Sequence, residues 1–170
     1  MVINKEKVIS IALILSIVIV GILPLFFYQR FMETSLKKEC LKATINAIKI
    51  EINRHREWLE APDVENREEV LSRLNKLTAD LERYENMKIE EYVIPEKREV
   101  IGWIEGPYEI DTLLYIENMT RSGPFYHIVG IRGNTTIKPN KKYLMTIYLV
   151  YPRYYPFESY YVYVYKYKEI

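Results

Sequence analysis

The stretch VISIALILSIVIVGILPLFFY, residues 8–28, contains no charged side chain, and the expected architecture of the chain depends on it. At about 1.5 Å per helical residue it would reach roughly 31 Å, which matches a hydrocarbon core about 30 Å thick. Lys7 precedes it, and Phe27 and Arg30 lie where interfacial aromatic and basic anchors occur. The sequence therefore predicts a single transmembrane helix over residues 8–28, after a short cytoplasmic tail over residues 1–7.

A cleavable secretory signal is the alternative interpretation of residues 8–28. The apolar run is longer than a typical signal core and no small-x-small cleavage pattern follows it, so the sequence favours an uncleaved signal anchor. Charges on the two sides of the segment leave its orientation open. The sequons at Asn118 and Asn134 lie in predicted turns, which makes both asparagines candidate glycosylation sites. Together with a resemblance to surface proteins described below, the sequons favour a cell-membrane location with the bulk of the chain extracytoplasmic.

Composition and motif content limit the function classes. The chain has 170 residues, a net charge of +1 and no basic stripe, so nucleic acid is not an expected partner. Cys40 is the single cysteine, which excludes an intrachain disulfide and a cysteine-based zinc site. No phosphate loop, GxSxG or HExxH motif occurs. We therefore expect no enzymatic activity, no metal and no cofactor. The alternative of a small membrane-tethered hydrolase would require His127 beside a carboxylate and a hydroxyl in a closed cleft.

Two apolar stripes predict a helical segment over residues 29–91. Pro62 ends the first helix, and either Asp63 or Asn66 can cap the second, with Glu69 three residues after Asn66 in a capping-box-like pair. A turn near residues 60–66 favours an antiparallel coiled-coil hairpin. A parallel coiled coil between chains would use the same seam and make the protein a homo-oligomer. The stripes, spaced 4, 3, 4 and 3, are Leu41, Ile45, Ile48, Ile52, His55 and Leu59, then Val70, Leu74, Leu77, Leu81 and Tyr84.

The same pattern assigns the polar residues of the first helix. Lys42 and Glu51 fall outside the stripe and are expected to face solvent. His55 falls within it, where a polar residue helps to fix the register of the two helices. A metal-binding role for His55 is not expected, because His127 is the only other histidine and no HxxxH or cysteine pattern accompanies either.

Residues 92–170 have a different composition and are expected to form an all-β domain. Fourteen of the sixteen tyrosines lie here, among β-branched residues and turns rich in Pro and Gly. Short strands at this spacing favour a small antiparallel β-sandwich. In the last strand, alternation places valines toward the core and tyrosines on the other face. The expected strands are residues 99–104, 112–116, 125–131, 143–151 and 160–167.

One local pattern carries a resemblance to a known fold. Ile137, Pro139 and Tyr143 have the offsets of a tyrosine corner, in which the ring enters the core and the hydroxyl returns to upstream backbone. The pattern resembles fibronectin type III and immunoglobulin-like sandwiches. The order of turns and strands around it, with Glu117-Asn118 and an Ile-x-Pro-Asn segment, is also similar to β domains of archaeal surface and pilus-associated proteins. The resemblance implies an immunoglobulin-like sandwich and a cell-surface setting.

These inferences combine into one expected protein of the α+β class. It has a transmembrane helix, a helical hairpin and a β-sandwich, and it acts as a single-pass, membrane-anchored structural or interaction protein. The expected partners are the lipid bilayer and either a protein partner or a surface glycan. The loop over residues 152–157 is the candidate interaction site because aromatic residues and arginine are enriched at interfaces. Carbohydrate binding there is the alternative function. The interaction residues are Arg153, Tyr154, Tyr155 and Phe157.

Overall fold

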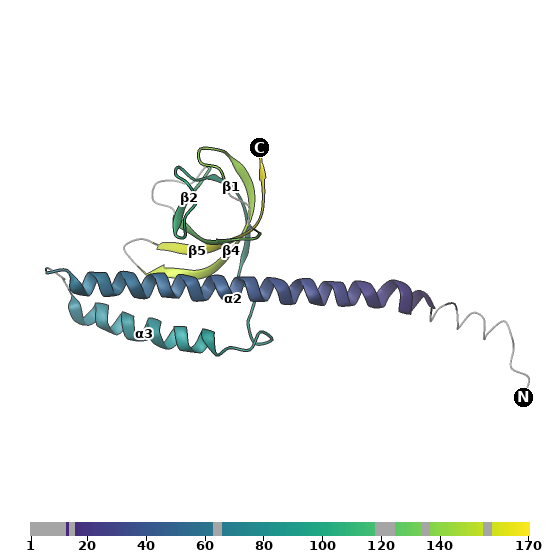
Figure 1. Cartoon of the computed structure of the whole chain (residues 1–170), viewed down its shortest axis with the longest axis horizontal. Coiled ribbons are helices and arrows are strands. Elements are labelled where there is room, and N and C mark those ends of the chain that lie inside the picture. Colours follow the sequence, from purple (N-terminus) through teal and green to yellow (C-terminus); the bar gives the residue numbers. More distant parts are fainter. Residues whose placement is uncertain (1–12, 14–15, 63–65, 118–124, 134–136, 155–157) are drawn as a thin grey trace, which may run out of the picture. The chain divides into compact units, whose positions relative to one another are not determined.

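The computed structural model describes residues 13, 16–62, 66–117, 125–133, 137–154 and 158–170 (Figure 1). The chain divides into two compact units, Met1–Leu36 and Lys37–Ile170, and the boundary falls within one long helix. The helices are a short π-helix η1 (Val18–Ile22), α2 (Leu23–Glu60) and α3 (Arg67–Glu85). The strands are β1 (Lys97–Trp103), β2 (Thr112–Ile116), β3 (Phe125–Ile131), β4 (Tyr143–Tyr154) and β5 (Glu158–Glu169).

The predicted transmembrane helix is wrong. Within the described ranges, no helix has both the length and the apolar content needed to cross a membrane. Residues 8–12 and 14–15 lie outside the described part. The signal anchor, the single-pass location and the extracytoplasmic bulk all depended on this helix, so they are wrong with it.

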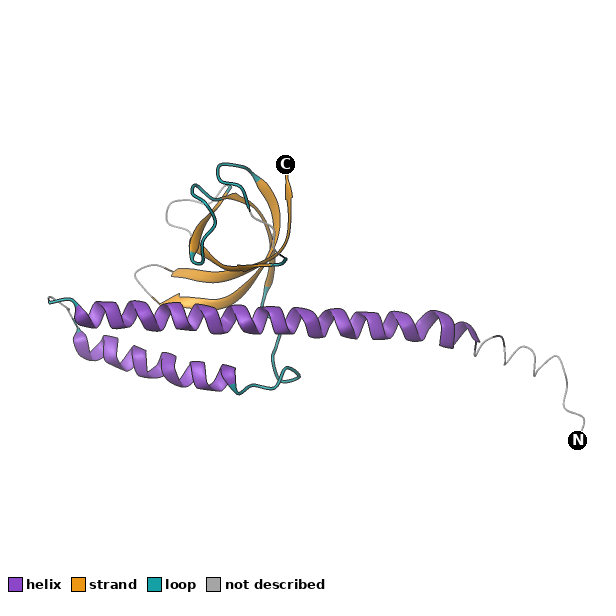
Figure 2. Cartoon of the chain, viewed as in Figure 1, coloured by secondary structure: helices purple, strands orange, loops and turns teal. Residues whose placement is uncertain are grey.

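Helices α2 and α3 form an antiparallel pair joined by a short turn (Figure 2). An ion pair of 2.8 Å joins Lys49 Nζ in the second half of α2 to Glu85 Oε1 at the end of α3. The predicted capping box does not form, since Asn66 has φ 60° and its side chain makes no cap hydrogen bond. Its backbone carbonyl instead accepts hydrogen bonds from the N–H groups of Glu69 and Val70. The turn is therefore fixed by left-handed backbone at Asn66 rather than by a side-chain cap.

The predicted β-sandwich is also wrong, because the five strands close into one barrel. Their order around the barrel is β1-β2-β3-β5-β4, and β4 pairs again with β1. Every pairing is antiparallel except that of β3 with β5, which is parallel. This arrangement is a five-stranded Greek-key barrel of the OB-fold type. Register shifts in the β4–β5 ladder, near Ile147 and Tyr151, bend these long strands. The bend lets β4 pair with β1 and β5 pair with β3 while β4 and β5 also pair with each other.

Side chains from all parts of the barrel fill its interior. Val162 and Val164 of β5 are fully buried there, as the alternation of the last strand predicted. Gly102 permits the close approach of β1 and β2, because a Cβ at this position would lie 2.5 Å from the carbonyl oxygen of Tyr115. The buried core comprises Ile104, Leu114, Tyr126, Ile128, Ile137, Tyr143, Met145, Ile147, Val162 and Val164.

The second half of α2 covers the outer face of the barrel. Tyr161 and Tyr163 alternate with the core valines of β5, and their hydroxyl groups contact carboxylates on α2. Small residues such as Ala43 and Ala47 are buried on the helix side and allow a close approach. Thr44 Oγ1 lies 2.8 Å from the Tyr92 hydroxyl and donates to the carbonyl of Val150 over 3.2 Å. Residues 161–164 of β5 are therefore buried on both faces, one in the barrel and one under α2.

In the unit Met1–Leu36 the described apolar side chains are largely exposed. Val20 is 76% exposed and Phe31 is 70% exposed. The π-helical segment η1 precedes Pro24, which lacks the N–H that an α-helix would donate to Val20. The described buried core therefore belongs to the unit Lys37–Ile170.

Candidate binding groove between helix α2 and the barrel

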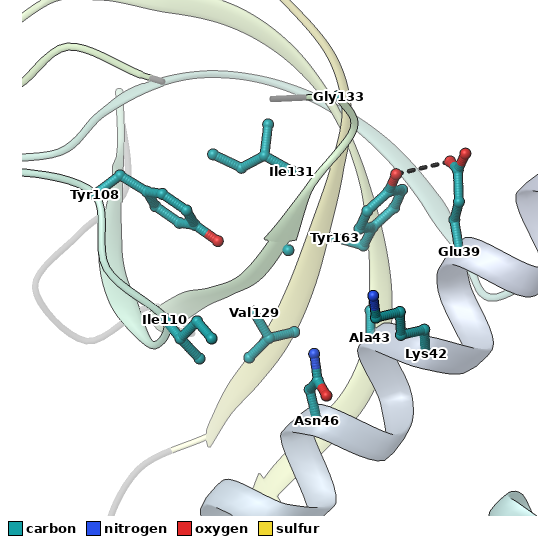
Figure 3. Close-up of a pocket in the computed structure, with 11 residues that line it drawn as sticks. Glu39, Lys42, Ala43, Asn46, Tyr108, Ile110, Val129, Ile131, Gly133 and Tyr163 are labelled. Atoms are coloured by element: carbon teal, nitrogen blue, oxygen red, sulfur yellow. Dashed lines mark hydrogen bonds between the residues drawn. The ribbon is translucent and has the colours of Figure 1, made fainter. Parts of the chain in front are cut away.

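A groove with a volume of about 590 Å³ separates part of α2 from the end of β3 (Figure 3). We call it the lateral groove. Its size falls in the range of about 300–1,000 Å³ that small-molecule and side-chain sites occupy. It is lined on the helix side by Glu39, Lys42, Ala43 and Asn46, and on the barrel side by Tyr108, Ile110, Val129, Gly130, Ile131, Gly133 and Tyr163.

The barrel side of the groove is an apolar wall. The short strand β2 begins at Thr112, which pairs with Ile128, so the end of β3 extends beyond it. The connection from β1 to β2 passes opposite that end and contributes Ile110, which is 62% exposed. Val129 and Ile131 complete the wall from β3. Ile110 is largely exposed and Ile131 is partly exposed, whereas Val129 is only 2% exposed, so the wall can receive an apolar group from outside the protein chiefly at Ile110 and Ile131.

Gly130 sets the distance between the groove floor and α2. A Cβ at this position would lie 3.0 Å from Tyr163 Cδ2 and 4.0 Å from the Cβ of Ala43. The β3–β5 register also shifts between Ile128 and Gly130. Any larger residue would push the Tyr163 ring toward the helix, so the glycine keeps both the strand bulge and the helix contact in place.

Glu39 is already committed to protein partners at one end of the groove. The Tyr163 hydroxyl donates to Glu39 Oε2 over 2.7 Å, and Arg132 Nε lies 3.5 Å from the same oxygen. Burial, and then the adjacent Glu39 carboxylate, raise the pKa of Tyr163 well above its ordinary value. The hydroxyl therefore remains a donor, and this end of the groove is electrostatically balanced.

Lys42, Asn46 and Tyr108 provide the remaining polar groups. In Figure 3 the Asn46 amide and the Tyr108 hydroxyl point into the space between helix and barrel. Within the described part of the chain, none of the three side chains has a hydrogen bond or ion pair. Burial raises the pKa of Tyr108, so its hydroxyl stays protonated. An exposed lysine, an amide and a hydroxyl thus surround an apolar wall without partners of their own.

A second polar cluster fastens α2 to the barrel, and we call it the helix–barrel clasp. The Tyr161 hydroxyl donates to Glu51 Oε1 over 2.5 Å and accepts from Arg54 over 3.2 Å. Arg54 also forms an ion pair with Asp111, and His127 Nδ1 lies 3.0 Å from Asp111 Oδ1. Asp111 has φ 77°, a strained backbone that these contacts hold in place.

The clasp corrects the solvent assignment of Glu51. Its side chain is only 4% exposed, because it accepts the tyrosine hydroxyl that projects from β5. His127 does lie beside a carboxylate, and its ring centroid is 5.9 Å from that of Tyr161. None of these residues lines the lateral groove. The arrangement therefore belongs to the contact between helix and barrel.

The predicted interaction residues lie at the edge of the described structure. Arg153 and Tyr154 end β4, where they pair with Ser159 and Glu158 in the backbone ladder. Tyr155 and Phe157 lie outside the described residues. The predicted glycosylation sites Asn118 and Asn134 are also outside them.

The residues of the predicted tyrosine corner lie together, but in a barrel. Tyr143 and Ile137 are buried in the core, at 3% and 1% exposure. The backbone N–H of Lys138 donates to the Tyr143 hydroxyl over 3.1 Å, and Pro139 is exposed between them. The local pattern thus returns a tyrosine hydroxyl to upstream backbone without specifying a sandwich.

Fold and site together define a Greek-key barrel with a helical hairpin docked on its outer face and a groove at their junction. Comparisons with protein-family models, with curated proteins and with solved structures find no match for this chain.

Proposed function

We propose that the protein is a non-enzymatic interaction protein whose lateral groove holds a short segment of a partner protein, with an apolar side chain next to a carboxylate. This proposal is supported by the arrangement of the groove, which has an apolar side and a positively charged side. Ile110, Val129 and Ile131 form an apolar wall, and Lys42 lies across from them on α2. An apolar side chain would cover the wall while its neighbouring carboxylate meets the lysine.

The expected affinity of one such residue is low. Burying a single apolar side chain contributes about 1.5–3 kcal/mol, and an exposed ion pair with Lys42 adds about 0–1 kcal/mol. A single-residue probe should therefore bind with a Kd on the order of 1 mM or weaker. A longer partner would gain affinity from contacts outside the groove.

Nuclear magnetic resonance titration with N-acetyl-phenylalanine tests the proposal. The neutral N-acetyl-phenylalanine amide is the matched probe, since the two differ in the carboxylate alone. We expect saturable shifts at Val129 and Ile131, with the acid bound about 2–5-fold more tightly than the amide. Equal binding of the two probes, or shifts that do not include the groove residues, would overturn the proposal.

Two variants separate the charged and apolar parts of the interaction. Lys42→Glu should remove the preference for the acid, whereas Ile110→Asp should weaken both probes. Lys88→Glu is the control, because Lys88 is an exposed lysine that does not line the groove. All three positions are exposed, so the variants should keep the fold. An unchanged acid preference in Lys42→Glu would contradict the assigned role of that lysine.

A further inference from the structure

A second, smaller cavity lies where α2, α3 and β4 meet. Its volume is about 160 Å³, and it is lined by His55, Arg73, Lys76, Leu77 and Tyr151. It shares no lining residue with the lateral groove. The interior surface comes from fully or nearly fully buried residues, while the exposed Lys76 lies at its edge. The cavity is therefore a separate site that the proposed function does not use.

His55 lines this cavity, and its buried ring has one nitrogen without a hydrogen-bond partner among the described residues. Its side chain is fully buried, and Nδ1 lies 2.8 Å from the backbone carbonyl oxygen of Glu51. A carbonyl oxygen only accepts, so Nδ1 carries a ring hydrogen, and the tautomer with that single hydrogen leaves an acceptor lone pair on Nε2. Among the described residues, Nε2 has no hydrogen-bond partner. A buried acceptor of this kind favours a ligand that brings a donor.

The other lining groups restrict that ligand to a small ring. Leu77 is 3% exposed and Tyr151 is 5% exposed, so both offer apolar surface in the interior. The Tyr151 hydroxyl donates to Asp80 Oδ2 over 2.7 Å. An apolar cavity of about 150 Å³ is known to hold one benzene molecule. The described residues contain no group of three His, Cys, Asp or Glu that could hold a metal ion here.

We propose that this cavity binds a small phenol-like molecule. Its ring packs against Leu77 and Tyr151, and its O–H donates to His55 Nε2. Neither Arg73 nor Lys76 is fully buried, and Arg73 forms a 2.6 Å ion pair with Glu69 on the same helix, so entry of the ring requires these side chains to move. Recognition depends on the donor, since a ring of the same size without one leaves Nε2 unsatisfied.

The test compares phenol with toluene on the full chain labelled with ¹⁵N-histidine. The two probes have the same size and differ in the donor group. We expect phenol to bind saturably with a Kd on the order of 1 mM, to shift the His55 Nε2 signal, and to give nuclear Overhauser contacts with the Leu77 methyl groups. Toluene should bind about tenfold more weakly because it offers no donor. Equal binding of phenol and toluene, or no saturable His55 shift, would overturn the proposal.

Variants make the assignment specific to this cavity. His55→Phe keeps a ring but removes the acceptor, so phenol and toluene should then bind equally. If that variant does not fold, the contacts between phenol and Leu77 in the unmodified protein decide the matter alone. Lys42→Glu, which changes the lateral groove, should leave phenol binding unchanged. Loss of phenol binding in Lys42→Glu would place the phenol in the lateral groove and contradict the cavity.

Discussion

Replacement of Tyr161 by phenylalanine removes one hydroxyl from the helix–barrel clasp and should destabilise the fold strongly. This hydroxyl donates to Glu51 over 2.5 Å and accepts from Arg54 over 3.2 Å. Burial, and then the charge of Glu51, raise the pKa of Tyr161 well above its ordinary value. The Tyr161 hydroxyl is therefore protonated at neutral pH and acts as a donor. The variant leaves the Glu51 carboxylate buried with one donor fewer.

Tyr163 provides a matched reference two positions further along β5. Its hydroxyl also donates to a glutamate of α2, but the Glu39 side chain is 31% exposed whereas that of Glu51 is 4% exposed. Water can replace the lost donor at Glu39 and cannot do so at Glu51. We expect Tyr161→Phe to cost about 1.5–3 kcal/mol and Tyr163→Phe to cost about 0.5–1.5 kcal/mol. At roughly 3 °C per kcal/mol, the Tm should fall by about 5–9 °C and 2–4 °C.

Urea unfolding followed by circular dichroism measures both costs, and a double-mutant cycle with Glu51→Gln isolates the pair. The interaction energy of Tyr161 with Glu51 should exceed that of Tyr163 with Glu39, measured through Glu39→Gln, by about 1 kcal/mol. Equal costs for the two tyrosine variants would refute the reasoning that burial of the acceptor decides the magnitude. A smaller cost for Tyr161→Phe would show that the clasp does not hold helix and barrel together.

Two further predictions concern backbone approach and pH. Gly102→Ala should lower the free energy of unfolding in urea by about 1–3 kcal/mol, because the added Cβ would lie 2.5 Å from the Tyr115 carbonyl oxygen. Gly106→Ala is the control and should change the free energy of unfolding little, because no atom lies within 4 Å of its added Cβ. Burial, with a smaller effect of Glu39, raises the pKa of the Cys40 thiol from 9.0 to about 12. The neutral thiol therefore contributes fully to stability below about pH 9, and this contribution is lost as the pH rises toward 12. Between these two pH values, the urea midpoint of the unmodified chain should fall by more than that of Cys40→Ala.

Local patterns in the sequence predicted where strands and helices form, but not how the sheet closes. Residues 112–116 and 125–131 are strands with the predicted bounds, because β-branched and aromatic residues alternate between turn signals there. Barrel closure depends on bends in β4 and β5, which come from register shifts that the alternation of side chains does not reveal. Sandwich and barrel therefore share the same strand pattern.

The candidate groove could not be predicted for a related reason. It needs α2 to lie on the barrel, and the α2 face that does so carries Cys40, Ala43, Thr44, Ala47 and Glu51 rather than large apolar residues. The coiled-coil stripe identified only the neighbouring face. One signal was present in the sequence: buried tyrosine hydroxyls need acceptors, and the tyrosines of the last strand required polar partners such as Glu39 and Glu51. The signal does not say which helix supplies them.

Both proposed sites depend on the docked state of α2. The groove combines Lys42 of the helix with Val129 of the barrel, and the cavity combines His55 with Tyr151, so neither site exists in a separated hairpin or barrel. Glu51, whose hydrogen bond with Tyr161 holds the docked state, lies between Lys42 and His55 along the helix. A ligand at either site must therefore stabilise docking by mass action. Binding at one site can raise the affinity of the other site only where the undocked state is populated. Coupling between the two sites should therefore be weak in the unmodified protein. It should become measurable when Tyr161→Phe loosens the clasp.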